Sequence, residues 1–61
     1  REYSAYWPRV ALAATLYLKG DLTGSLDAMN DAYRAKPDLS PEQIRYLVGQ
    51  RHARNLVALR A

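Results

Sequence analysis

Few side chains in this 61-residue chain have types and spacings that could support chemistry. His52 is its single histidine and there is no cysteine, so we expect no zinc site of the usual ligands. Asp27 and Asp31 would lie one turn apart on a helix, where two carboxylates could share a cation, but exposure beside Arg34 is the commoner arrangement. The sequence therefore predicts no catalytic residue, no metal site, no cofactor and no enzymatic activity of its own.

Arginine side chains form a second group of candidates, because the guanidinium group binds carboxylates and phosphates. Residues 40–61 carry four arginines against Glu42, whereas residues 1–39 are balanced, so the net charge of +3 lies wholly in the later segment. Arg45, Arg51 and Arg54 are candidate contacts for an anionic partner. Their spread around a predicted helix is also typical of a solvated face, and it argues against tracking of a nucleic-acid backbone.

A third candidate is an apolar stripe at helical spacing, formed by Tyr3, Trp7, Val10, Ala14, Tyr17 and Leu18. Tryptophan and tyrosine suit a protein interface, because large aromatic side chains supply contact area and keep a polar tip. The same stripe can instead be core that another helix covers. The sequence leaves both interpretations open.

The stripe requires a helix over residues 7–18, which begins somewhere from Ser4 to Trp7 with Ser4 as a candidate N-cap. Gly20 follows the last apolar residue of that pattern. Glycine has no Cβ, so it commonly ends a helix in the left-handed conformation, and we expect a positive φ at this position.

A second helix is expected over residues 22–36, antiparallel to the first, with Asp21 as its N-cap. Pro37 ends it, since the residue before a proline is displaced from helical geometry. Gly24 and Ser25 are small residues inside this helix, and we expect them to allow close contact between the two helix backbones.

Residues across this hairpin alternate between large and small in a recurring pattern around a Gly-Asp turn: Leu12, Ala13, Leu16, Gly20, Asp21, Leu22, Ser25, Leu26, Met29, Ala32 and Pro37. With this pattern, residues 7–37 resemble a tetratricopeptide repeat, a helix–turn–helix unit of about 34 residues. Arg9 departs from the family, which favours an aromatic residue there. The resemblance implies an all-α antiparallel hairpin and a protein–protein interaction or scaffold role. Partner peptides of the family lie along the first helix, at positions that correspond to Trp7, Val10, Ala14, Tyr17 and Leu18.

Residues 40–61 contain the clearest helix start in the chain. Ser40 as N-cap, Pro41 at the first helical position and Gln43 at the third form a capping box. We expect one helix over residues 41–59, with Gly49 as its weak point. It would be a capping helix that closes a repeat array through an apolar face of Ile44, Leu47, Val48 and Leu59, which Arg51 and Asn55 interrupt; a second apolar set comprises Tyr46, Ala53 and Val57.

A rival interpretation compares residues 40–61 with a DNA-binding helix-turn-helix motif, with Gly49 in the turn. That motif needs apolar residues just after the glycine and again in the recognition helix, to pack its helices together. Gln50 and Asn55 stand at those positions instead.

These observations favour a single small helical domain, or a fragment of a longer helical-repeat protein. A chain of this length buries only about 60% of its unfolded surface, and repeat units usually need neighbours for stability. The expected partner is a protein, neighbouring repeats of the same chain, or a second copy. The alternatives are a small basic helical module that binds nucleic acid and a regulatory segment of a larger enzyme. The apolar run Val10–Leu18 is far short of the roughly 20 residues that span a membrane.

Overall fold

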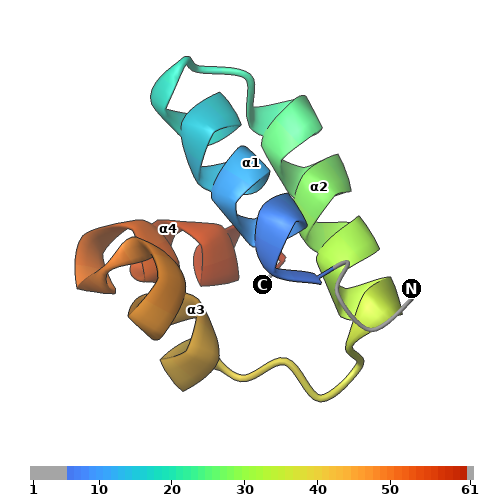
Figure 1. Ribbon diagram of the computed structural model, residues 1–61. Coiled ribbons are helices and arrows are strands. Elements are labelled where there is room, and N and C mark those ends of the chain that lie inside the picture. Colours follow the sequence, from blue (N-terminus) through green and yellow to red (C-terminus); the bar gives the residue numbers. More distant parts are fainter. Residues whose placement is uncertain (1–5, 61) are drawn as a thin grey trace.

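The computed structural model describes residues 6–60, which form four α-helices and no β-strand. They are α1 (Tyr6–Leu18), α2 (Leu22–Ala35), α3 (Pro41–Val48) and α4 (Gln50–Leu59). Helices α1 and α2 lie side by side and run in opposite directions (Figure 1). Helix α3 packs against α1, and α4 packs against α1, α2 and α3. The predicted all-α class is confirmed, whereas the candidate cap Ser4 lies outside the described residues.

The prediction of one capping helix over residues 41–59 is wrong, because the helix breaks at Gly49. Gly49 has a φ of +91° and a ψ of 163°, a region of backbone space that essentially only glycine occupies. Its N–H donates to the Arg45 carbonyl at 2.8 Å, and its carbonyl accepts from the Ala53 N–H at 2.9 Å. A single residue therefore ends α3 and starts α4, and the chain changes direction there (Figure 1).

The turn between α1 and α2 has the predicted positive φ, +87° at Gly20. The Gly20 N–H donates to the Tyr17 carbonyl and the Asp21 N–H donates to the Leu16 carbonyl, each at 3.0 Å. This pair of hydrogen bonds defines a Schellman motif, which satisfies carbonyls that a helix end leaves without partners. The Asp21 carboxylate then accepts from the Gly24 N–H at 2.9 Å and caps α2, as expected.

Replacing Gly20 with alanine is expected to lower the free energy of unfolding by about 1 kcal/mol, because an L-residue is disfavoured in the left-handed conformation. A Cβ added there would meet no atom within 4 Å, so the cost comes from the backbone alone. Urea denaturation followed by circular dichroism measures it. The exposed neighbour Lys19, replaced with alanine, is the control and should change stability by less than about 0.5 kcal/mol. Equal stabilities of the two variants would contradict the turn geometry.

Close contact between α1 and α2 occurs at Ser25. Its fully buried hydroxyl donates to the backbone carbonyl of Ala13 on the facing helix at 2.7 Å. The expectation for Ser25 is thus confirmed. Gly24 has a different role, since the atoms nearest to a Cβ added there belong to the carboxylate of the cap, Asp21.

Side chains from all four helices, together with one loop residue, form a single core: Val10, Ala13, Ala14, Ala28, Met29, Ala32, Leu39, Ile44, Ala53 and Leu56. Half of these residues are alanines, which let the helix backbones approach closely. The predicted apolar face of the last segment is corrected, because it omitted two core residues, Leu56, which is fully buried, and Ala53. Of its own members Ile44 is buried, whereas Leu47, Val48 and Leu59 are half-buried and pack against the core.

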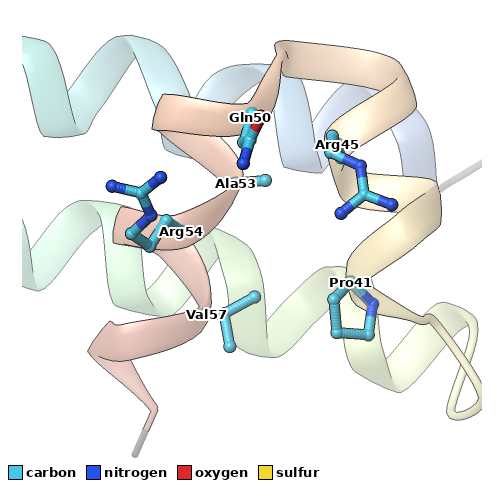
Figure 2. A pocket seen from close by; sticks show the side chains of 6 residues that line it. All are labelled: Pro41, Arg45, Gln50, Ala53, Arg54 and Val57. Atoms are coloured by element: carbon cyan, nitrogen blue, oxygen red, sulfur yellow. The ribbon is translucent and has the colours of Figure 1, made fainter.

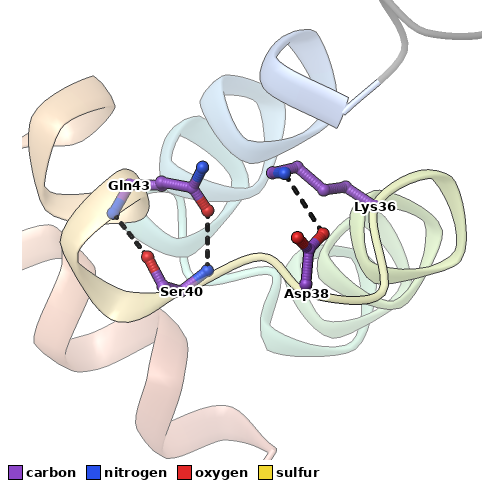
Figure 3. A network of polar contacts seen from close by, with 4 residues as sticks. All are labelled: Lys36, Asp38, Ser40 and Gln43. Atoms are coloured by element: carbon purple, nitrogen blue, oxygen red, sulfur yellow. Dashed lines mark hydrogen bonds and ion pairs between the residues drawn. The ribbon is translucent and has the colours of Figure 1, made fainter.

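Polar contacts fix the loop between α2 and α3 (Figure 3). The Ser40 hydroxyl accepts from the Gln43 N–H at 3.2 Å, and the Gln43 side-chain oxygen accepts from the Ser40 N–H at 2.9 Å, so the predicted capping box is confirmed. The Lys36 ammonium donates to the Asp38 carboxylate at 3.1 Å. This hydrogen bond holds the pKa of Asp38 below its ordinary value.

The C-terminal end of α4 is tied to α2 through Arg60. Its guanidinium carbon lies 4.2 Å from the centre of the Tyr33 ring, and its Nε donates to the Asn30 side-chain oxygen at 3.0 Å. A cation over an aromatic ring and a charge-assisted hydrogen bond both favour this arrangement. Arg60 thus supports the position of α4, where two of the three candidate arginines lie.

Candidate functional site

The predicted partner-binding stripe on α1 is divided between the core and the surface. Val10 is fully buried and Ala14 is 8% exposed, so both belong to the core. Tyr17 is half-buried. Trp7 and Leu18, in contrast, are 53% and 68% exposed. Among the described members of the stripe, those open to a partner are therefore chiefly Trp7 and Leu18; Tyr3 lies outside the described residues.

Trp7 and Leu18 share one line along α1, because eleven residues correspond to about three helical turns. Ala11 lies between them, about 40° from Trp7 around the helix, and is also exposed, whereas Ala14, about 20° from Trp7 on the opposite flank, is buried. We call Trp7, Ala11 and Leu18 the α1 edge. Leu12 is 50% exposed but lies on another side of the helix. Trp7 and Leu18 are the large exposed apolar side chains of the predicted stripe and are therefore its candidate contact positions.

The three candidate arginines are all exposed, and within residues 6–60 none of their guanidinium groups makes an ion pair or hydrogen bond. Arg45 and Arg54 line an open groove of about 240 Å³ between α3 and α4. Figure 2 shows Arg45 on the α3 side and Arg54 on the α4 side, with the Arg54 guanidinium directed away from Arg45. Arg51 is not among the residues that line it, so the predicted cationic set separates into a pair and a single residue.

The break at Gly49 brings Arg45 and Arg54 together. On one continuous helix, two residues nine positions apart would point in opposite directions, about 180° apart. The separate axes of α3 and α4 allow both arginines to line the same groove (Figure 2). Sequence reasoning missed this groove because it treated the two helices as one, and the signal that could have indicated it was Gly49 itself.

The side chains considered above for catalysis or metal binding lie neither at the α1 edge nor in the groove between α3 and α4. Asp31 pairs with Arg34 at 3.2 Å in an exposed position, as expected, and Asp27 is exposed. His52 is half-buried on α4. Among residues 6–60, no group of three or more histidine or carboxylate side chains is placed to hold a metal ion.

The helix-turn-helix comparison changes with the structure. Ala53 and Leu56 pack α4 into the core, while Gln50 is exposed and Asn55 half-buried, so positions 50 and 55 are not the packing positions. The objection from those two residues was therefore misplaced. A different objection replaces it, since the DNA-binding motif has a turn of about three or four residues, whereas here Gly49 alone separates α3 from α4.

Comparison of the chain with protein-family models, curated proteins and solved structures found no match. The tetratricopeptide resemblance therefore rests on the residues that carry it. None of the helices in the described part of the chain has both the length and the apolar character needed to cross a bilayer.

Proposed function

We propose that this chain is a protein–protein interaction module: a tetratricopeptide-like hairpin of α1 and α2, closed by the two helices α3 and α4. The α1 edge is its contact surface for a partner protein, a neighbouring repeat or a second copy of the chain. The observation that carries this proposal is the exposure of Trp7 and Leu18 along one line of α1, directly beside the face that packs into the core. Tryptophan is among the residues that contribute most to binding energy at protein interfaces.

Local geometry of the hairpin supports the same proposal. The repeat family places a Gly-Asp pair in its turn, and here Gly20 and Asp21 form the helix end and the next helix start. The family also places small residues where its two helices meet, and here the Ser25 hydroxyl reaches the Ala13 carbonyl. The turn and the close approach of the two helices are both features that the family pattern would produce.

Replacing Trp7 with alanine is expected to weaken association of the chain while its helicity stays nearly unchanged. Truncating an interface residue of this kind typically costs about 2 kcal/mol or more of binding free energy, or roughly 30-fold in Kd. Because the side chain is 53% exposed, its loss should leave the monomer fold intact. Sedimentation equilibrium measures self-association, and circular dichroism of the same samples measures helicity.

The matched control is Leu12→Ala, because Leu12 lies on the same helix and is 50% exposed, yet it is outside the α1 edge. This control should associate as the unaltered chain does. An unfolded Trp7→Ala monomer would assign the tryptophan to the core and contradict the proposal. Equal weakening by both substitutions would show that association does not use the α1 edge.

A further inference from the structure

The groove between α3 and α4 combines an apolar floor with a cationic rim. Ala53 is buried, Val57 is half-buried, and the Pro41 ring lies at one end (Figure 2). Arg45 and Arg54 stand on the two walls, and no acidic side chain lines the groove. The groove therefore offers an apolar contact between two positive charges.

The two arginines of this rim have no ion-pair partner within residues 6–60. Neither the Arg45 nor the Arg54 guanidinium makes an ion pair or hydrogen bond there. The amino end of α4 also has no side-chain cap, and Gln50 at that end lines the groove. The free N–H groups of a helix start add positive potential, so an anionic ligand is the complement of this surface.

The size and the charge pattern narrow the class of ligand. The groove has a volume of about 240 Å³, below the roughly 300–1,000 Å³ of sites that hold drug-sized molecules. This size favours a ligand that inserts a few side chains, such as a peptide, over a cofactor. A nucleic-acid backbone needs a run of cations along its phosphates, whereas Arg51 lies outside the groove. An apolar floor between two arginines instead matches an aliphatic side chain flanked by carboxylates.

We propose that this groove docks a linear peptide segment of a protein partner, in which acidic residues flank an aliphatic one. Arg45 and Arg54 pair with the two carboxylates, and the aliphatic side chain lies on Ala53 and Val57. The complementary charges of the arginines and the carboxylates make binding selective for an acidic peptide, and contact with the apolar floor fixes its position in the groove. The site belongs to α3 and α4, so it is independent of the proposed contact at the α1 edge.

The probe is the blocked peptide acetyl-Gly-Glu-Leu-Glu-Gly-amide, titrated into the isotope-labelled full chain at physiological salt and followed by NMR. Amide shifts are expected to saturate at groove residues and to leave Trp7 and Leu18 unchanged. Arg45→Gln and Arg54→Gln should each raise the Kd about tenfold, or about 1.4 kcal/mol, because each removes a charge-assisted hydrogen bond. Both arginines are exposed, so neither change should disturb the fold.

Arg51→Gln is the matched control, since it removes the same charge from α4 outside the groove; its Kd should change by less than about twofold. A second control replaces both glutamates of the peptide with glutamine, which should abolish saturable binding. The proposal is overturned by an absence of saturable shifts at the groove, by equal weakening from Arg51→Gln and Arg54→Gln, or by equal binding of the glutamine peptide. Displacement of the peptide by a short single strand of thymidines would also overturn it and assign the groove to nucleic acid.

Discussion

Leu56→Ala is expected to lower the free energy of unfolding by about 2–5 kcal/mol, because it removes buried methyl groups and leaves a cavity. Leu56 is fully buried and belongs to the core that joins all four helices. A single core in a chain of this size rarely supplies more than about 3–5 kcal/mol. A large fraction of the Leu56→Ala chain should therefore be unfolded at room temperature, which thermal and urea denaturation followed by circular dichroism would show.

The control for this prediction is Leu18→Ala, measured at protein concentrations too low for association. It deletes the same atoms from a side chain that is 68% exposed, so stability should change by less than about 0.5 kcal/mol. A Leu56→Ala chain as stable as the Leu18→Ala chain would mean that α4 is not packed on the α1–α2 pair in solution. The groove between α3 and α4 would then lose its structural basis.

L-alanine at position 49 is expected to lower the free energy of unfolding by about 1–3 kcal/mol, because the backbone there has a φ of +91° and a ψ of 163°. Crowding is not the cause, since a Cβ added at Gly49 would meet no atom within 4 Å. D-alanine should be tolerated, because these dihedrals lie close to the mirror image of the β region. It should even stabilise the chain by about 0.4–1 kcal/mol by restricting the unfolded state.

Both epimers can be made by chemical synthesis of the full chain, and urea denaturation compares them directly. The two chains differ in handedness at one carbon, so a difference between them reports the backbone conformation at position 49 and nothing about composition. Higher helicity and higher stability in the L-alanine chain would contradict the break. Such a result would mean that α3 and α4 fuse into the single helix that the sequence predicts.

The helix ends that could be predicted from the sequence are those with local signals. Gly20 is followed directly by a capping residue, Asp21, and Ser40 is followed by Gln43 at the spacing of a capping box, so neighbouring residues decide both places. Gly49 lacks such a neighbour, because no side chain caps α4. A glycine inside a helical pattern costs only about 1 kcal/mol, so its role depends on distant contacts that bury Ala53 and Leu56.

The apolar stripe on α1 shows that prediction from the sequence has a similar limit at the candidate site. Periodicity identifies which side chains face one way, but not how much of that face neighbouring helices cover. Tyr17 and Leu18 are adjacent and about 100° apart around the helix, and the first is half-buried while the second is exposed. The exposed side of the stripe depends on where α2, α3 and α4 all pack against α1, and the break at Gly49 sets the direction of α4 relative to α3.

The buried hydrogen bond between α1 and α2 has a consequence for the register of the two helices. Alanines such as Ala13, Ala28 and Ala32 bring the backbones close, but small apolar surfaces of similar shape would also fit after one helix slides along the other. A slide of half a turn, about 2.7 Å, would carry the Ser25 hydroxyl away from the Ala13 carbonyl and leave it between two turns of α1. Because a buried hydroxyl without an acceptor costs about 1–3 kcal/mol, this one polar atom disfavours the alignments that would place it between two turns of α1.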